Sequence, residues 1–302
     1  MAIQPDFDPR ELESVLGEPV KLAPVTSGQS NPTWFVSTTT RDLVLRKKPA
    51  GATASSAHAV DREHRVMSAL AASEVPVPAM VRFEADPTVI GTPFYLMERL
   101  YGQVSEDSDL PALVPADRGA VFRDAARVLA AVHKVDWQNA GLADYGKASD
   151  YYPRQVRRWA RQWDTAKAAG MEKTFCDRID ALSGWFAENI PAASPTTLVH
   201  GDYRIGNLMY GTNPARVEAV LDWELSTLGD PLSDLAHWMM FYALSPDQMG
   251  GLAGLDLATL GIPDGAAFLD HYRASGGCDA PLTRFHRAFA FYRMSVILAG
   301  IT

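Results

Sequence analysis

The sequence predicts an α+β protein of two lobes, because strand-like and helix-like segments are separated along the chain. Before residue 100, runs rich in Val, Thr, Leu and aromatic residues are separated by turn residues, as in a meander of antiparallel strands. After residue 100, long stretches have the apolar spacing of helices, and one short β-rich block interrupts them. We therefore expect one lobe over residues 1–99 and a second lobe over residues 100–302.

The N-terminal lobe is expected to contain an antiparallel sheet and two helices. Asp8 precedes a proline and caps a short helix that runs to about Leu16. Apolar side chains share one side of a second helix within residues 58–72. The predicted strands are 21–28, 33–40, 42–48, 75–86 and 91–100.

The C-terminal lobe is expected to be mainly helical, with a small β insert. Helical spacing extends over residues 115–135, 151–163 and 174–190, and from residue 230 to the end. Two strand-like segments, 197–211 and 216–224, precede the last helical region. This order differs from the regular β-α-β alternation of a dinucleotide-binding domain.

Composition and charge argue against several classes of protein. The chain has 302 residues with 28 basic and 36 acidic side chains, and its net charge of −8 is unlike that of a nucleic-acid-binding protein. Two cysteines are too few for a disulfide framework or a thiolate zinc cluster, and they indicate a reducing compartment. There is no apolar run of membrane-spanning length and no signal-peptide pattern. We expect a cytoplasmic protein whose final apolar segment is a helix cut short.

The densest polar cluster in an apolar setting is the segment LVHGDYRIGNLM, residues 198–209. Asn207 follows Asp202 by five residues, and Asp222 comes fifteen residues later, directly after the strand-like VEAVL. Phosphoryl transfer needs a carboxylate that orients the attacking hydroxyl and takes its proton. It also needs Mg²⁺, which prefers hard oxygen ligands. The spacing predicts Asp202 as the catalytic carboxylate and Asn207 and Asp222 as magnesium ligands.

The H-x-D-x4-N pattern with its later Asp matches the catalytic loop and metal-binding aspartate of protein-kinase-like proteins. HGDYRIGN followed by DWE resembles the aminoglycoside phosphotransferase family, whose relatives include choline kinases, from about residue 22 to residue 242. The resemblance implies a bilobal protein-kinase-like fold, with an N-terminal nucleotide-binding lobe over residues 1–99 and a C-terminal catalytic and substrate-binding lobe over residues 100–302. It also implies ATP and Mg²⁺ as cofactors, and transfer of the γ-phosphate to a small-molecule hydroxyl. It implies a structural role for His200, whose side chain bonds the backbone near the metal-binding segment.

The resemblance also implies residues that hold the nucleotide phosphates. Arg204 takes the position of a lysine that reaches the transferred phosphate, where a guanidinium stabilises developing charge. The V-L-R triplet aligns with the A-I-K of the phosphate-binding strand, so Arg46 takes the lysine position, with Lys47 and Lys48 as alternatives. Glu63 is the expected helix partner of Arg46.

Further nucleotide contacts are expected on backbone groups. Gly28 and Ser30, between the first two strands, are expected to cover the phosphates. The backbone of Glu98 and Leu100 is expected to bind the adenine. Glu224 either assists a second Mg²⁺ or supports the loop.

Four arginines suggest the charge of the phosphate acceptor. Within residues 151–163, Val156, Trp159 and other large apolar side chains fall on one arc of the expected helix. The opposite arc carries Arg154, Arg157, Arg158 and Arg161. Like charges repel, so a nearby anion accounts for this stripe more readily than a polycationic aminoglycoside does, and a solvated helix face is the alternative. We expect these arginines to bind the acceptor.

The segments SNPT, VLRKKP, HGDYRIGN and VLDWELSTLGDPLSDLA resemble the branch of the family found fused to, or encoded beside, acyl-CoA dehydrogenases. That resemblance implies a hydroxyacyl acceptor, such as a CoA thioester, and a functional link to an acyl-CoA dehydrogenase. Three alternatives stay open. They are an aminoglycoside O-phosphotransferase, a nucleotide-binding pseudokinase favoured by Arg46 in the lysine position, and a metal-dependent hydrolase that uses His200, Asp202, Asp222 and His237.

Overall fold

The computed structural model describes residues 4–26, 31–49, 60–192 and 194–300. The chain divides into two compact units. Unit 1 extends to Gln103 and includes Glu218–Leu225, and unit 2 comprises Val104–Val217 and the chain from Ser226 onward. The segment 218–225 therefore groups with unit 1, whereas the sequence analysis placed it in the second lobe.

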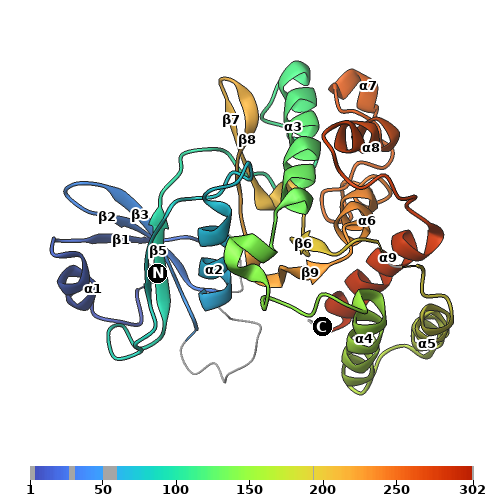
Figure 1. Ribbon diagram of the computed structural model, residues 1–302, viewed down its shortest axis with the longest axis horizontal. Helices are drawn as coiled ribbons and strands as arrows, with labels where there is room; N and C mark the ends of the chain where they lie inside the picture. The colour runs from blue at the N-terminus through green and yellow to red at the C-terminus, as the bar shows by residue number, and fades with distance from the viewer. Residues whose placement is uncertain (1–3, 27–30, 50–59, 193, 301–302) are drawn as a thin grey trace. The chain divides into compact units, whose positions relative to one another are not determined.

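Unit 1 is built on a five-stranded antiparallel sheet with the strand order β1-β2-β3-β5-β4 (Figure 1). The expected antiparallel sheet is confirmed, and each predicted strand segment contains one strand. The strands are β1 (Lys21–Pro24), β2 (Thr33–Ser37), β3 (Asp42–Lys47), β4 (Met80–Glu84) and β5 (Phe94–Glu98). The two helices are α1 (Pro9–Leu16) and α2 (Val60–Leu70), and α2 packs on β4 and β5.

Strand alternation creates the apolar side of this sheet. Trp34 and Val36 on β2 and Leu43 and Leu45 on β3 are buried in one cluster with Leu12 of α1. Side chains at alternate positions share a face, so these residues cover one side of the sheet. Arg46 belongs to the opposite alternation, and this leaves its guanidinium available for polar partners.

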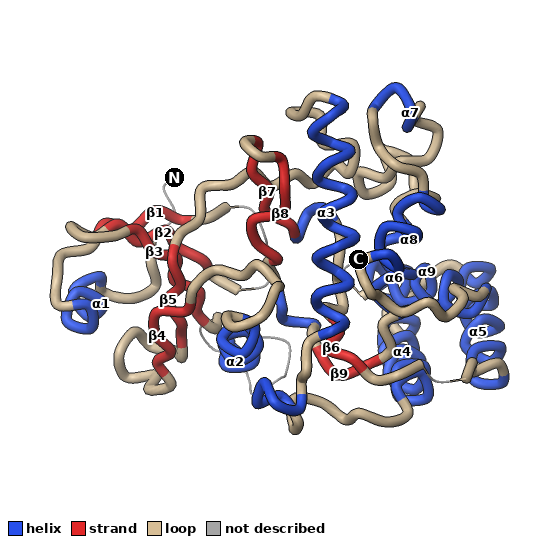
Figure 2. Tube along the Cα trace, turned by 45° about the horizontal axis from the view of Figure 1, so that its top comes forward, coloured by secondary structure: helices blue, strands red, loops and turns tan. Residues whose placement is uncertain are grey.

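Unit 2 is mainly helical and contains a small amount of β structure, as predicted (Figure 2), but its described strands form two pairs, one of which includes a strand that was not predicted. The strand pairs are β6 (Thr197–Val199) with β9 (Thr227–Gly229), and β7 (Leu208–Thr212) with β8 (Ala215–Val220). The longer helices are α3 (Pro115–Lys134), α4 (Tyr151–Lys167), α5 (Lys173–Glu188) and α9 (Arg284–Ala299). The helical region after residue 230 is divided into α6 (Leu232–Met240), α7 (Leu257–Leu260), α8 (Gly265–Ala274) and α9.

An aromatic cluster joins α4, α5 and α9, which lie side by side in Figures 1 and 2. Trp159 and Trp163 of α4 are buried against Phe186 of α5 and Phe285 and Phe289 of α9. The expected apolar arc of α4 is therefore confirmed. No helix in the described ranges is long and apolar enough to cross a membrane.

Removing one ring from this cluster is expected to destabilise the protein. Phe186 is fully buried, whereas Phe291 on α9 is 36% exposed. Phe186→Ala is expected to lower the free energy of unfolding by about 3–5 kcal/mol in chemical denaturation, because a buried cavity replaces the ring. Phe291→Ala is the matched control, with an expected loss below about 1 kcal/mol. Equal losses would show that the cluster does not hold these helices together.

Candidate active site

Unit 1 gathers an arginine and three carboxylates beside its sheet. Arg46 lies on β3, and its Nη2 is 2.7 Å from Asp222 Oδ1 and 3.9 Å from Glu224 Oε2. Arg46 Nε lies 3.1 Å from Oε2 of Glu63, which belongs to α2. The structure thus brings the expected pair Arg46 and Glu63 together and adds two acidic partners from the segment 218–225.

The backbone of this segment explains how Asp222 reaches Arg46. Val220 N–H donates to Pro76 O at 2.8 Å, which ties the segment to unit 1. Trp223 is fully buried, and the short turn Trp223–Leu225 packs on α2. Asp222 has a φ of 62°, a left-handed conformation that aspartate tolerates better than most residues. The turn therefore directs the Asp222 carboxylate to the arginine.

Burial and charge act in opposite directions on Glu63. Its side chain is 1% exposed, and Tyr95 Oη donates to Glu63 Oε2 at 2.9 Å. Burial raises the pKa of Glu63 to about 7, because desolvation and the nearby Asp222 charge outweigh the favourable charge of Arg46. Burial also acts to lower the pKa of Arg46, but Glu63 and Asp222 hold it above the ordinary value, so the guanidinium stays charged.

The three carboxylates have the chemistry of a divalent-cation site. One oxygen each from Glu63, Asp222 and Glu224 lies within 4.8 Å of the others. Within the described ranges, Glu63 Oε1 is buried without a hydrogen-bond partner, and a bound cation would satisfy it. These residues fit Mg²⁺, although Asp222 would share its carboxylate between the cation and Arg46.

The neighbouring lysine does not join this cluster. Lys47 is 1% exposed, and its Nζ lies 2.6 Å from Asp6 Oδ1 and 5.1 Å from the centre of the Phe7 ring. Its position next to Arg46 in the strand directs it to the other face of the sheet. The alternative in which Lys47 replaces Arg46 is therefore wrong.

The remaining nucleotide contacts expected in unit 1 are backbone groups. Glu98 is the last residue of β5, and its N–H donates to Ala79 O at 2.9 Å. Leu100 lies two residues beyond the strand. Gly28 and Ser30, the expected phosphate-covering turn, lie outside the described residues. The adenine and phosphate contacts at these positions stay predictions.

In unit 2, the loop between β6 and β7 brings Asp202 and Asn207 together. Asn207 Nδ2 donates to the main-chain O and to Oδ2 of Asp202, both at 2.8 Å. Gly201 has a φ of 85°, a left-handed conformation that lets the chain turn sharply before Asp202. With its nitrogen committed to Asp202, Asn207 has its oxygen Oδ1 to offer to a metal ion.

A buried carboxylate on α6 fixes the start of this loop. Asp234 is fully buried and accepts from His200 N–H at 2.7 Å and from Gly201 N–H at 2.8 Å. His133 Nε2 lies 3.3 Å from Asp234 Oδ2. Asp202 N–H in turn donates to His200 Nδ1 at 3.2 Å. Asp234 is therefore a structural acceptor, and the His200 ring accepts from the backbone of its own loop. The expected contact of His200 with the metal-binding segment stays a prediction.

His237 and Arg293 keep Asp202 ionised. His237 Nε2 lies 2.8 Å from Asp202 Oδ1, and Arg293 donates to the carbonyl oxygen of Gly201. Burial acts to raise the pKa of Asp202, but the His237 contact and the charges of Arg293 and Arg204 hold it well below its usual range. Asp202 is thus a carboxylate at neutral pH and can accept a hydrogen bond from a substrate hydroxyl.

Sequence reasoning named His237 together with Asp202 only in the metal-dependent hydrolase alternative, and it did not find Arg293. The structure places the His237 ring on Asp202. The only available signal was the spacing of three residues from Asp234, which puts both side chains on one face of α6. Arg293 lies on the last helix, and no sequence pattern connects it to the loop.

Arg204 lies in the same loop and has an acidic partner. Its Nη1 is 2.9 Å from Glu106 Oε2, and its Nε is 3.7 Å from Asp202 Oδ2. A Cβ on Gly206 would lie 2.0 Å from Arg204 Nη1, so the glycine leaves room for the guanidinium. Glu106 is 70% exposed, and an ion pair of this kind is weak enough to exchange for a phosphate.

The arginine stripe of α4 is only partly available to a ligand. Arg157, Arg158 and Arg161 are exposed, whereas Arg154 Nη2 donates to Lys147 O at 2.7 Å. Their role in acceptor binding stays a prediction.

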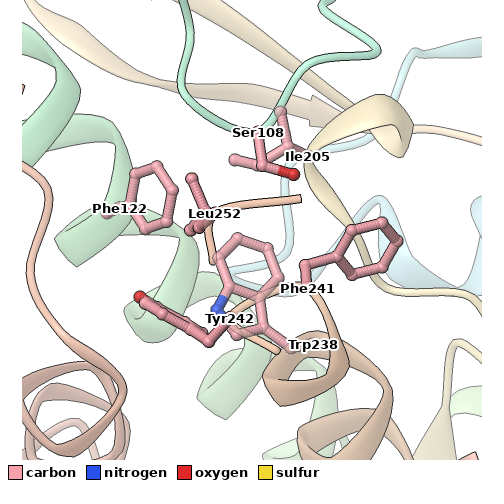
Figure 3. Close-up of a pocket in the computed structure, with 7 residues that line it drawn as sticks. All are labelled: Ser108, Phe122, Ile205, Trp238, Phe241, Tyr242 and Leu252. Atoms are coloured by element: carbon pink, nitrogen blue, oxygen red, sulfur yellow. The ribbon is translucent and has the colours of Figure 1, made fainter. Parts of the chain in front are cut away.

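Two hollows of unit 2 lie beside the Asp202 loop and the residues that contact it. Most of the side chains that line the first hollow, shown in Figure 3, are apolar. Ile205 of the Asp202 loop contributes to it together with Phe122, Trp238 and Phe241. The second hollow is lined by residues that include His237 and Arg293.

The raised pKa of Glu63 predicts a pH dependence of stability. The ordinary value is 4.5 and the folded value is about 7, so between these limits the folded chain holds more protons than the unfolded chain. The free energy of unfolding therefore falls as pH rises through this window. In metal-free protein, Glu63→Gln is expected to remove up to about 3 kcal/mol of this fall, measured by urea denaturation at pH 5 and pH 8.

The matched control for this measurement is Glu188→Gln, because Glu188 is an exposed glutamate of α5. It is expected to keep the pH dependence of the starting protein. A Glu63→Gln protein with the unchanged pH dependence would contradict the raised pKa.

Comparison with known proteins identifies the family. Residues 21–281 match the sequence model of the phosphotransferase enzyme family. The chain is 40% identical to mouse acyl-CoA dehydrogenase family member 10, across 100% of this chain and 28% of that protein. It is 34% identical to human acyl-CoA dehydrogenase family member 11, across 99% of this chain and 39% of that protein. The chain thus spans between about a quarter and two fifths of these curated relatives.

Solved structures agree with this result. A "putative aminoglycoside phosphotransferase" from Ralstonia eutropha superposes with a TM-score of 0.86 at 40% identity, covering 98% of this chain and 88% of that one. A macrolide 2'-phosphotransferase from Brachybacterium faecium, at 19% identity, a TM-score of 0.64 and coverage of 96% and 89%, shares the fold. The protein-kinase-like fold and the resemblance to the branch associated with acyl-CoA dehydrogenases are confirmed. The chain belongs to the phosphotransferase enzyme family.

Proposed function

We propose that this protein transfers the γ-phosphate of Mg-ATP to a hydroxyl group of a small acyl compound. The observation that carries the proposal is the geometry of Asp202, whose carboxylate contacts Asn207 and His237 in a loop that Asp234 fixes through two backbone N–H groups. A carboxylate kept free of protons and fixed in direction is what the attacking hydroxyl requires.

The residues of the two units have complementary roles in this proposal. Asp202 accepts a hydrogen bond from the acceptor hydroxyl, orients its oxygen and takes its proton as the phosphoryl group is transferred. Asp222 of unit 1 and Asn207 Oδ1 of unit 2 are the proposed ligands of Mg²⁺, which would neutralise charge on the phosphates. Arg46 binds phosphate oxygens, and Arg204 leaves Glu106 to stabilise the charge on the transferred group.

Two observations support an acyl compound as the acceptor. The curated relatives that the chain matches are acyl-CoA dehydrogenase family members by name. The hollow that borders the Asp202 loop is lined mostly by apolar side chains (Figure 3), which suits an acyl chain better than a polycation. The exposed arginines of α4 would attract the phosphates of a CoA thioester and repel an aminoglycoside. On this proposal, an acyl-CoA dehydrogenase either uses the product of this protein or supplies its substrate.

The first test is transfer of radiolabelled γ-phosphate in the presence of Mg²⁺. Asp202→Asn is expected to lower kcat by about 10²- to 10⁴-fold, because the amide cannot take the hydroxyl proton. The matched control is Asp270→Asn, since Asp270 of α8 is 79% exposed at its side chain. ATP binding without transfer to any acceptor would instead indicate a pseudokinase, and phosphate release without an acceptor would indicate a hydrolase.

The acceptor class is tested by giving the same enzyme two panels of compounds. Short hydroxyacyl-CoA thioesters are expected to be phosphorylated with a kcat/KM at least about tenfold above that of aminoglycosides, because the exposed cationic helix face favours anions. The preference is expected to shrink as ionic strength rises. Efficient transfer to aminoglycosides and none to hydroxyacyl compounds would overturn the acyl assignment and leave the phosphotransferase assignment in place.

A further inference from the structure

The second hollow of unit 2 has a lining that the proposed function does not yet use. It lies among α4, α6 and α9. Its polar lining residues are Tyr151, Tyr152, Gln155, Ser233, His237, His286 and Arg293. His237 is also the residue that contacts Asp202, so the hollow adjoins the catalytic carboxylate through one side chain.

Several of these polar side chains have hydrogen-bonding atoms without partners. In the part of the chain that the structure describes, Tyr152 Oη, His286 Nε2 and Arg293 Nε are buried and make no hydrogen bond. Tyr152 and His286 are each only 3% exposed. A buried polar atom without a partner costs about 1–3 kcal/mol, so three around one hollow indicate that something else occupies it.

The three unpartnered atoms are all hydrogen-bond donors. His286 Nδ1 accepts from Thr283 N–H at 3.1 Å, which leaves the ring proton of the neutral imidazole on Nε2. Burial lowers the pKa of His286, which favours this neutral form. Arg293 Nε carries a proton at all times, and a tyrosine hydroxyl donates readily.

The nearby acceptor groups are already engaged. Asp230 Oδ1 accepts from Leu232 N–H at 2.9 Å, and Asp230 Oδ2 accepts from Ser194 N–H at 3.2 Å. Gln155 Oε1 accepts from Trp159 Nε1 at 3.2 Å. The hollow therefore has more unbonded hydrogen-bond donors than acceptors, which suits a ligand with several acceptor oxygens.

Charges of both signs act on the hollow. The guanidinium carbon of Arg293 lies 5.8 Å from the centre of the Trp159 ring, and that of Arg158 lies 5.3 Å from the same ring. The carboxylates of Asp230 and Asp234 act on Tyr152. The two guanidinium groups are the part of this lining that favours carboxylate or polarised carbonyl oxygens.

We propose that the donors Tyr152, His286 and Arg293 bind the acyl oxygen of the phosphate acceptor while Asp202 holds its hydroxyl. The inference rests on the proposed function and deepens it, because it makes the acceptor a hydroxy acid or its thioester. A free carboxylate and a thioester carbonyl offer the same acceptor oxygen. Arg293 links the binding of the acyl oxygen to the position of Asp202, since it also donates a hydrogen bond to the carbonyl oxygen of Gly201, the residue before Asp202.

The test separates a ligand-binding hydroxyl from a structural one. Tyr152→Phe removes an unpartnered hydroxyl, and Tyr292→Phe is the matched control from the same aromatic cluster, because its hydroxyl lies 2.7 Å from Ser183 Oγ. The acceptors are hydroxybutyrates with the hydroxyl at carbon 2, 3 or 4 and their N-acetylcysteamine thioesters. The matching butanediols, which lack the acyl oxygen, complete the set.

We expect Tyr152→Phe to raise the KM or dissociation constant of the acyl acceptors about fivefold to tenfold. It should leave the dissociation constant of ATP and the thermal midpoint unchanged. Tyr292→Phe should lower the thermal midpoint and leave acceptor binding unchanged. The butanediols should bind weakly to both proteins. Preference for the free acid or for the thioester identifies which source of the acyl oxygen is used.

Three outcomes would contradict either the inferred acyl-oxygen site or the proposed function. A Tyr152→Phe protein with a lower thermal midpoint and unchanged acceptor binding would show that a structural water satisfies the hydroxyl, and would overturn the inference. Transfer to butanediols or aminoglycosides but not to acyl compounds would also overturn it and leave the phosphotransferase function intact. Binding of hydroxybutyrate or its thioester that weakens in Tyr152→Phe, without any phosphoryl transfer, would support the site and contradict the proposed function.

Discussion

The candidate site of unit 2 depends on one buried carboxylate. Asp234 has no exposed surface, and it accepts from two consecutive backbone N–H groups at the start of the loop that carries Asp202. Two backbone amides that converge on one buried carboxylate fix the path of the chain. The positions of Asp202 and Asn207 follow from this anchor. His133 supports Asp234 from α3, so the loop is fixed from two helices.

The surroundings of two acidic side chains shift their pKa values in opposite directions. Asp202 and Glu63 are both largely buried, and burial alone would raise the pKa of each. Around Asp202 a histidine and two arginines outweigh this effect, so the carboxylate stays charged. Around Glu63 a single arginine serves three carboxylates, and the pKa rises to about 7. The first arrangement suits a group that must stay charged and accept a hydrogen bond, and the second reflects three carboxylates that share one arginine.

The sequence was sufficient for the fold class and for the order of elements in both units. Alternating and helical apolar spacing identified the strands of unit 1 and the buried face of α4, because burial imposes these periods directly. It missed β9, since three residues carry too little pattern to identify a strand. It also placed the segment 218–225 in the second lobe, because a contact such as Val220 N–H with Pro76 O leaves no trace in local spacing.

The site was only partly accessible to sequence reasoning. Motif spacing led to Asp202, Asn207, Arg46 and Glu63, because these residues occur in or align with a known local pattern. Arg293 and Tyr152 could not be found in this way, since their importance comes from the packing of α9 and α4. Lys47 was a reasonable alternative to Arg46 until the structure showed its ion pair with Asp6.

Phosphorus NMR of the full reaction tests the central claim most directly. The protein, Mg-ATP and a short hydroxyacyl thioester would be followed until ATP is consumed. We predict that the γ-phosphate signal is replaced by that of a phosphate monoester coupled to the carbon-bound proton of the acceptor, together with ADP. Conversion of ATP to ADP and inorganic phosphate alone, with no monoester from any hydroxyacyl compound, would contradict the account.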